Sequence, residues 1–137
     1  MKKLIALIPS VLLLLSANPV QAGRTEPQPK PCYFFRGEQL ELRETCIYES
    51  TSWAGGGLSK LVWEDGVVTS IKWGLQGRGE KTTCNGEMMS VDNVCALSYS
   101  RHPITLKRIS RETMERMNRN DQNVIYCHQT GRNSVCY

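Results

Sequence analysis

Two histidines, His102 and His128, are the side chains of this chain most suited to proton transfer. In a small basic protein, one histidine acting as base and the other as acid would give a ribonuclease, with Lys107 or Arg108 stabilising the charged phosphorane. The sequence places His102 in an expected loop and His128 in an expected strand. No local pattern supports catalysis by either, so a surface or structural role for both is the preferred interpretation.

Six cysteines indicate disulfides, because an even set without a C-x-x-C pair argues against zinc binding and redox catalysis. A two-residue turn at Gly131 and Arg132 would place Cys127 directly opposite Cys136, close enough to bond. Gly131 can take the positive φ that opens such a turn. Cys84–Cys95 and Cys32–Cys46 are suggested as the remaining pairs. The sequence offers no geometric argument for them, so their connectivity stays open.

Residues 101–119 form the best binding candidate, with six basic and two acidic side chains. Basic side chains lie before and at the start of an expected helix, where the positive end of the helix dipole makes them unfavourable. This cost suggests that the basic side chains serve a function. Expected partners are an anionic glycan, a lipid headgroup or an acidic protein, and the alternative is a solvated basic face. The residues concerned are Arg101, Lys107, Arg108 and Arg111.

Trp63 is the second binding candidate. On an open sheet face it would offer a flat platform for a sugar ring or a partner protein. The alternative is burial beneath the single expected helix, since that helix must cover one face of the sheet.

Other motifs carry no chemistry. The glycine spacing of residues 74–79 is similar to a phosphate-binding loop, but Glu80 stands where the pattern needs lysine. No serine lies in a nucleophile-elbow pattern, and the adjacent carboxylates Glu64 and Asp65 fall in a turn. The sequence therefore predicts no catalytic residue, no metal ligand and no cofactor, and enzyme activity is left uncertain but disfavoured.

The amino-terminal residues 1–22 have the pattern of a secretion signal. Lys2 and Lys3 precede an apolar run at residues 4–15, and Val20-Gln21-Ala22 supplies a small-x-small cleavage pattern. The apolar run is too short to span a bilayer, which takes about 20 residues, so the mature chain is expected to lack a transmembrane segment. Cleavage near Ala22-Gly23 would make the protein secreted or periplasmic, where cysteines oxidise.

Removal of the signal segment would also change the net charge of the chain. Of 17 basic and 13 acidic residues, Lys2 and Lys3 would be removed, leaving 15 against 13, or +2. That excess is too small for a protein that coats a polyanion. Three prolines in residues 23–31 predict an extended, mobile leader without a packed role, followed by one domain over residues 32–137.

Strands are expected at residues 32–35, 39–49, 94–100, 124–129 and 134–137, on alternating patterns and bounding turns. The clearest hairpin joins residues 58–64 to 67–73 through Asp65-Gly66, which would pair Glu64 with Val67. That register predicts a core face containing Leu58, Val62, Val67, Ile71, Trp73 and Thr69, with Trp63 pointing to the opposite side.

Residues 104–120 hold the one good helix signal, with Ser110 as N-cap and a staple between Ile109 and Met114. Together these elements predict a mainly β fold: a small antiparallel sheet or barrel-like domain with one short helix, stapled by disulfides.

The chain also resembles uncharacterised small exported cysteine-containing proteins of cyanobacteria. The resemblance rests on Cys32-Tyr-Phe-Phe-Arg-Gly-Glu, on Leu61-Val-Trp-Glu-Asp-Gly and Ser70-Ile-Lys-Trp, and on the end Asn133-Ser-Val-Cys-Tyr. It implies an envelope or exterior setting and no known activity. Size, export and β content are similar to the small β-barrel lysozyme inhibitors of the bacterial envelope, but their Ser-Gly-x-x-Tyr-like loop is not found here.

These observations favour a non-enzymatic exported binding module that contacts its partner through residues 101–119. The alternatives are an inhibitor of an extracellular hydrolase and, in third place, a small secreted ribonuclease.

Overall fold

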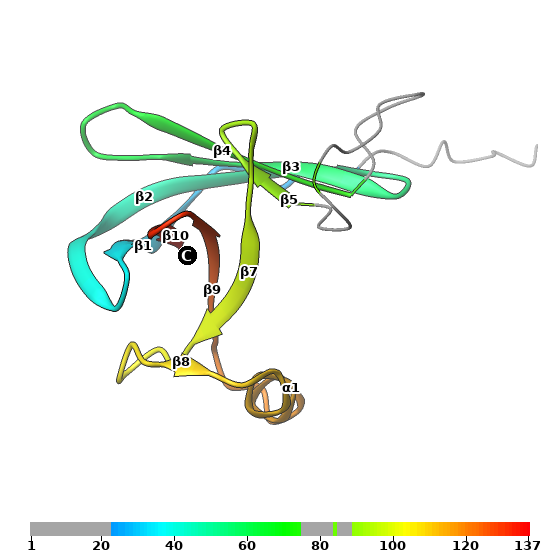
Figure 1. The fold of residues 1–137 in the computed structure, drawn as a ribbon. Helices are drawn as coiled ribbons and strands as arrows, with labels where there is room; N and C mark the ends of the chain where they lie inside the picture. Colours follow the sequence, from blue (N-terminus) through cyan, green and yellow to red (C-terminus); the bar gives the residue numbers. More distant parts are fainter. Residues whose placement is uncertain (1–22, 75–83, 85–88) are drawn as a thin grey trace, which may run out of the picture.

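The structure is a computed structural model that describes residues 23–74, 84 and 89–137. Within these residues ten strands form one antiparallel sheet, accompanied by one helix (Figure 1). The elements are β1 (Gln28–Arg36), β2 (Gln39–Trp53), β3 (Gly56–Val62), β4 (Val68–Gly74), β5 (Met89–Val91), β6 (Val94–Cys95), β7 (Leu97–Arg101), β8 (Arg108–Ile109), α1 (Arg111–Arg119), β9 (Ile125–Thr130) and β10 (Asn133–Cys136). A mainly β, antiparallel and disulfide-stapled fold is confirmed.

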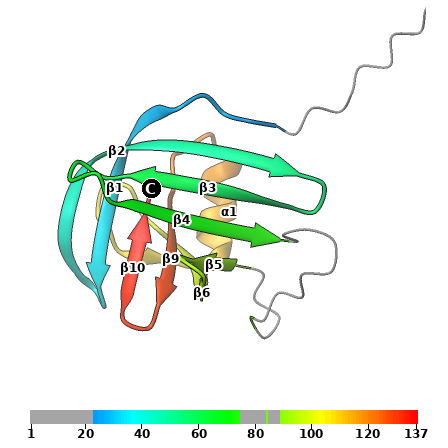
Figure 2. The ribbon, with the colours of Figure 1, turned by 90° about the horizontal axis from the view of Figure 1, so that it is seen from above.

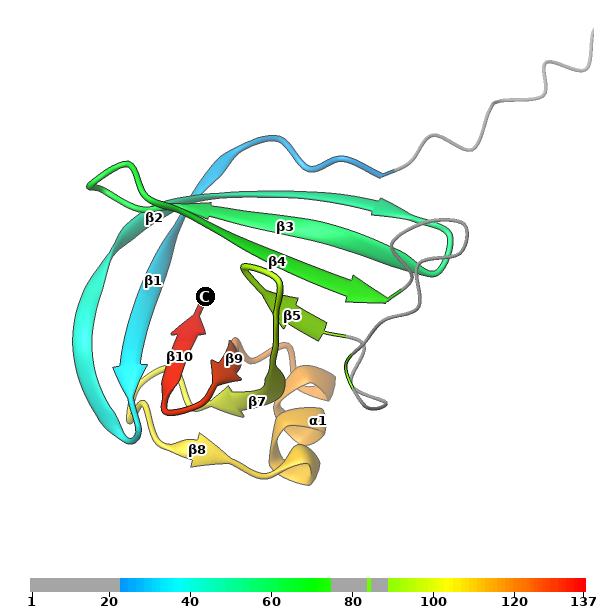
Figure 3. The same ribbon diagram turned by 45° about the horizontal axis from the view of Figure 1, so that its top comes forward.

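The strands follow the order β6-β5-β4-β3-β2-β1-β10-β9-β7-β8. Strand β2 has 15 residues and curves strongly, so that β3, β4 and β5 come to face β10, β9 and β7 across a half-barrel (Figures 2 and 3). A register shift between Phe34 and Phe35 of β1 lies opposite this bend. Such an irregularity increases local twist, which helps to roll the sheet.

Alternate side chains of the strands fill the concave face of this half-barrel. Cys32, Cys46, Leu61 and Ile71, one from each of β1 to β4, are fully buried, and Val135 of β10 packs with them. A second cluster lies on the opposite face, around Phe35, Tyr33 and the Cys127–Cys136 pair, with Ile125, Tyr99 and Leu106 as neighbours. The period-two alternation of the strands thus divides one sheet between two apolar cores.

All three cysteine pairs suggested from the sequence are disulfides in the structure: Cys127–Cys136, Cys84–Cys95 and Cys32–Cys46. The terminal hairpin has the predicted register, with Cys136 opposite Cys127, and Gly131 has a φ of 58°. The Cα atoms of these two cysteines are 4.1 Å apart. Gly131 and the two-residue turn therefore set the register that joins the sulfurs.

The predicted register of the β3–β4 hairpin is wrong by one residue. Val62 pairs with Val68, and the backbone N–H of Trp63 donates to the carbonyl of Val67 at 2.9 Å. Of the two turn residues Asp65 and Gly66, only Gly66 has a positive φ, at 85°. The chain therefore uses a three-residue loop ending in a glycine bulge rather than the two-residue turn that needs two positive φ values.

Because of this one-residue shift, the β3 residues that were predicted to face the core lie on the opposite face of the sheet. Leu61 and Trp63 face the core in place of Leu58 and Val62, while Thr69 and Ile71 of β4 face it as predicted. A one-residue slip exchanges the two faces of a strand, which explains the size of the error. Trp63 and Trp73 therefore lie on the same face, not on opposite faces. The Trp73 ring lies over Gly57, where a Cβ atom would collide with it.

The proline-rich leader is extended as expected and its side chains are mostly exposed, but its end is paired in the sheet, which the prediction of a mobile leader did not include. Its last residues belong to β1, where Pro29 pairs with Ile47 and Pro31 with Thr45. Ahead of β1, Thr25 accepts a hydrogen bond from Ser50 N–H at 2.8 Å. Prolines at alternate residues remove donors from only one edge of a strand, so the other edge can still pair with β2.

The helix is shorter than the segment of residues 104–120 in which the sequence pattern predicted it. Ser110 is its N-cap, as predicted, and accepts from Thr113 N–H at 3.1 Å. Residues 104–109 form a loop and β8 instead, and Leu106 has a φ of 59°, which no helix contains. The expectation that this helix covers a sheet face is also wrong: α1 stands beside β7, and the concave core is covered by the sheet's own curvature (Figure 3).

Candidate functional site

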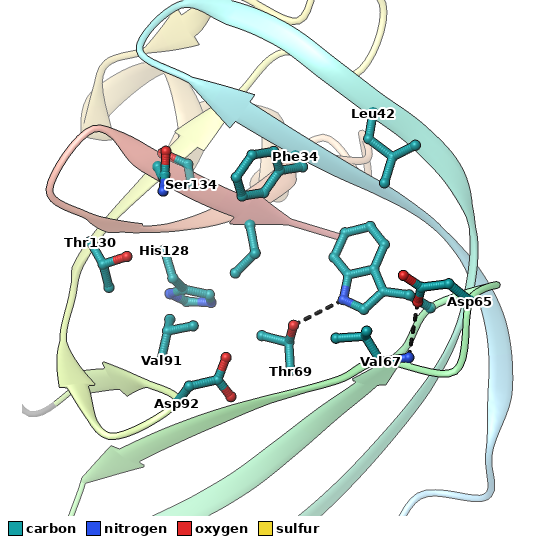
Figure 4. A pocket seen from close by; sticks show the side chains of 13 residues that line it. Phe34, Leu42, Asp65, Val67, Thr69, Val91, Asp92, His128, Thr130 and Ser134 are labelled. Carbon is teal, nitrogen blue, oxygen red and sulfur yellow. Dashed lines mark hydrogen bonds between the residues drawn. The ribbon is translucent and has the colours of Figure 1, made fainter.

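A cavity of about 310 Å³ opens on the concave face between the two limbs of the half-barrel. Figure 4 shows Phe34 and His128 from one limb facing Thr69 and Val67 from the other. We call it the concave cavity, lined by Phe34, Leu42, Trp63, Asp65, Val67, Thr69, Val91, Asp92, His128, Thr130, Asn133, Ser134 and Val135. Six of these thirteen side chains are apolar and seven are polar or charged, so the walls are mixed. A cavity of this size lies within the range of small-molecule sites.

The Trp63 ring forms one wall of the concave cavity. Its indole Nε1–H donates to Thr69 Oγ1 at 2.9 Å across the β3–β4 pair. Trp63 is 8% exposed, so it is not the open platform that the sequence suggested. The hydrogen bond fixes the ring and satisfies its only donor, so the ring meets a ligand through its π surface and edge.

Two aspartates stand at the rim on the same side. Asp65 follows Trp63 in the β3–β4 loop, and its Oδ1 accepts from Val67 N–H at 2.9 Å. Asp92 opens the β5–β6 turn, and its Oδ1 accepts from Ser70 N–H at 2.8 Å. In each of these aspartates, one carboxylate oxygen is thus held by a backbone N–H. Within the described residues neither forms an ion pair.

The turn that carries Asp92 has a special geometry. Val91 pairs with Val94, and both Asp92 and Asn93 have positive φ, at 47° and 66°. This pattern is a two-residue hairpin turn in which aspartate and asparagine take the place of the more usual glycine. Because Asp92 N–H also donates to the Ser70 carbonyl at 2.8 Å, the turn is fastened to β4 by two hydrogen bonds.

His128 forms part of the inner wall. It is 5% exposed, its Nδ1 lies 3.0 Å from Ser98 Oγ, and its Nε2 lies 3.4 Å from the Tyr137 hydroxyl. Burial lowers the pKa of His128 to about 4. The imidazole is therefore neutral near pH 7 and adds no positive charge to the cavity.

The Ser98–His128 pair has the spacing of a nucleophile and its base. The low pKa of His128 makes it a weak base at neutral pH, and its second nitrogen faces a tyrosine hydroxyl rather than an orienting carboxylate. Burial also raises the pKa of Tyr137 to about 12, so that hydroxyl stays protonated. The pair consequently fits a structural hydrogen bond better than proton abstraction.

A second cavity of about 400 Å³ lies on the other side of His128, between β7, β9 and the start of α1. Its lining includes Ser98, Ser100, Arg111 and Tyr126. Arg111 is its one charged side chain, and that guanidinium is bound to Glu115 at 2.9 Å. This helix-side cavity shares His128 with the concave cavity but has no carboxylate in its lining.

The basic residues singled out in the sequence do not form one surface. Arg101 is 1% exposed: its Nη1 lies 3.0 Å from Glu38, and its guanidinium lies 3.9 Å from the Phe35 ring centre. Arg108 binds the same Glu38 at 2.6 Å and stacks on Tyr99 at 3.9 Å.

Lys107, Arg108 and Arg111 remain on the surface, and Arg111 is paired with Glu115. Of the four predicted binding residues, Arg101 is therefore the buried one. The sequence does not distinguish a buried arginine from a surface arginine when the partner of the buried one, here Glu38, is more than 60 residues away.

The two histidines do not share a site. His102 Nδ1 lies 3.2 Å from Ile104 N and 3.3 Å from Thr105 N, accepting from the turn that follows it. Ser98 is opposite His128, so His102 is four residues further along the strand direction. At about 3.3 Å per residue the separation is roughly 13 Å, too far for both to flank one phosphate.

Two sequence features lie outside the described residues: the signal segment, and residues 75–79 of the glycine-rich stretch with the Glu80 that follows it. In the part of the chain that is described, no three metal-ligating side chains come together. No helix there is long and apolar enough to cross a membrane.

Comparison with models of protein families, with curated proteins and with solved structures finds no match in any of the three. The functional inference therefore rests on the geometry of the concave cavity. Sequence reasoning missed Asp92 and placed Asp65 in an ordinary turn. The signal was present in Val91-Asp92-Asn93-Val94, where two residues tolerant of positive φ separate two valines.

Proposed function

We propose that this chain is a non-enzymatic exported binding protein whose ligand, a small molecule with an apolar body, occupies the concave cavity. The observation that carries the proposal is a cavity of about 310 Å³ with walls from both limbs of one rolled sheet. Rolled and barrel-like sheets commonly bind ligands at such openings.

The apolar walls supply the driving force. Phe34, Trp63, Val91 and Val135 present apolar surface to the concave cavity from four different strands or loops. Each Å² of apolar surface removed from water contributes about 25 cal/mol. A ligand with an aromatic or branched aliphatic body would cover these side chains at once.

Disulfides in all three pairs support export, because such bonds persist in oxidising compartments. We therefore retain cleavage near Ala22-Gly23 and a secreted or periplasmic location as part of the proposal.

An anionic partner held by residues 101–119 has less support. Arg101 and Arg108 already share Glu38, and Arg111 is paired with Glu115. Inhibition of an extracellular hydrolase and ribonuclease activity gain no specific contact from the geometry. Both are checked by adding the purified protein to lysozyme with a cell-wall substrate, and to RNA.

The direct test is binding of N-phenyl-1-naphthylamine, a neutral apolar probe that becomes fluorescent in an apolar environment. Val67 lines the concave cavity, whereas Val68, the next residue, is on the other face of β4; the two are 57% and 47% exposed. Val67→Trp should fill the opening and reduce binding at least tenfold. Val68→Trp adds the same ring to the opposite face and should leave binding unchanged.

Equal effects of the two substitutions would contradict the proposal, as would a wild-type protein that does not bind the probe. Thermal unfolding of each variant checks that both remain folded.

A further inference from the structure

We infer that the ligand of the concave cavity carries a cationic group, an ammonium or related cation attached to an apolar body. This inference rests on the proposed function and adds the charge of the ligand. It is argued from the charged and aromatic groups around the cavity.

The charge of the concave cavity has one sign. Its lining contains two carboxylates, Asp65 and Asp92, and no lysine or arginine. His128 in its wall is neutral near pH 7, because burial lowers the pKa of this imidazole to about 4. Lys72 of β4 donates to Asn93 Oδ1, in the same turn as Asp92, at 2.8 Å.

This local charge is opposite to that of the chain as a whole, which has a formal net charge of +4. Of the carboxylates in the described residues, Glu38, Glu41, Glu49 and Glu115 have arginine or lysine partners, and the others, including the two cavity aspartates, have none. Asp65 and Asp92 differ from the other unpaired carboxylates in lining the concave cavity. Two carboxylates without ion pairs beside such a cavity are free to receive a cation from outside.

The Trp63 ring adds a second attraction for the same group. Indole is the best aromatic partner for a cation lying over its face, and quaternary ammonium groups are recognised in this way. Trp63 and Asp65, two residues apart at the end of β3 and in the loop that follows it, both line the concave cavity, so a cation bound there can meet the ring and the carboxylate together. Asp92 stands across Val67 and Thr69 on the same side, within the same lining.

An anionic ligand would find no positively charged side chain in this lining. It would face both carboxylates and a neutral imidazole, in a partly desolvated site where like charges are most unfavourable. The helix-side cavity has no carboxylate in its lining, and its one charged side chain, Arg111, is paired with Glu115. Of these two cavities, the concave one therefore offers carboxylates to a cation.

The test is displacement of bound N-phenyl-1-naphthylamine by three molecules of similar size at pH 7: 2-phenylethylammonium, 2-phenylethanol and 3-phenylpropionate. The ammonium should displace the probe at a concentration at least tenfold below that of the alcohol, and the carboxylate should be the weakest. Added salt should reduce the advantage of the ammonium, because part of that advantage is electrostatic.

The double variant Asp65→Asn with Asp92→Asn keeps an acceptor oxygen at each position and removes both charges. It should bring the ammonium and the alcohol to within about twofold of each other. The matched control is Glu26→Gln with Glu112→Gln, two exposed carboxylates without ion pairs in the described residues. It removes the same charge and should preserve the preference for the ammonium.

If the alcohol or the carboxylate displaces the probe as well as the ammonium does, the cation preference is overturned while binding in the cavity stands. If the control variant loses the preference as fully as the aspartate variant, the effect belongs to global charge and the inference is overturned. Failure of the probe itself to bind contradicts the proposed function, and this inference with it.

Discussion

The buried position of His128 removes the charge that a surface histidine gains as the pH falls below neutrality. The ring is enclosed by the concave face and held by Ser98 and the Tyr137 hydroxyl, and its pKa falls to about 4 because of burial. An ionised imidazole there would be desolvated without a carboxylate partner. The folded state therefore excludes the proton that the unfolded chain accepts.

We expect this exclusion to appear as pH-dependent stability. The pKa is lowered from 6.5 in the unfolded chain to about 4 in the fold, so the contribution is complete above pH 6.5 and is lost as the pH falls to about 4. The full loss is roughly 3 kcal/mol. Urea unfolding across this range measures it. The His128→Gln variant should show a flatter profile, and a wild-type decline no steeper than that of the variant would contradict the assignment.

Arg101 illustrates the opposite case, a charge that the fold retains in its interior. Its guanidinium contacts Glu38, the Leu106 carbonyl at 2.8 Å and the Phe35 ring. Arg101→Met should lower the free energy of unfolding by about 2–3 kcal/mol, less than for a fully buried pair because Glu38 is 65% exposed. Arg111→Met, on a side chain that is 88% exposed, should change it by less than about 0.5 kcal/mol. Equal losses in urea unfolding would show that Arg101 is not structural.

Among the elements, the β1–β2 turn is tied to the far limb through Glu38. Desolvation acts to raise the pKa of this carboxyl, but hydrogen bonds and charges from Arg101 and Arg108 outweigh it and lower the pKa below 4.5. The contribution of Glu38 is therefore present above pH 4.5 and lost as the pH falls through the lowered value. Comparison of wild type with Glu38→Gln should show a stability difference at pH 7 that shrinks below pH 4. A difference that persists at low pH would contradict the ionic origin.

The disulfides join different parts of the sheet, which makes them separable. Cys127–Cys136 closes a short loop between the adjacent strands β9 and β10 near the middle of the sheet, and Cys84–Cys95 reaches the edge strand β6. Their separations of 9 and 11 residues give similar loop-closure contributions, about 2–3 kcal/mol each.

Replacing each pair by serine should therefore cost similar global stability but different local order. Amide hydrogen exchange should speed up in β10 and β9 for the Cys127–Cys136 variant, and around β5 and β6 for the other. Exchange that rises equally throughout the sheet in both variants would show that the two pairs are not locally distinct.

At the scale of the whole molecule, export and oxidation are tested together. We expect the mature protein to begin at or near Gly23 and to contain no free thiol, as in the described structure. Intact mass with and without reductant should differ by the six hydrogens of three disulfides. A reactive thiol in the unreduced protein, or retention of residues 1–22, would contradict this expectation.

The sequence by itself determined the features that depend on neighbours along the chain. The alternation of apolar residues indicated strands, Ser110 began the helix, and Gly131 fixed the turn that pairs Cys127 with Cys136. Each of these is set by local backbone geometry within a few residues. The same local reasoning was wrong at Asp65-Gly66, where two turn geometries differ by one residue and the choice reversed the faces of β3.

Only the tertiary structure decided which residues share a surface. The roll of the sheet moved Arg101 inside and brought Trp63, Asp65 and Asp92 to one cavity with His128. These positions come from the curvature of β2 and from pairings between strands far apart in sequence, which no local pattern specifies. Burial then changed what the side chains can do: it left His128 neutral, so that the concave cavity has the charge of its two aspartates alone.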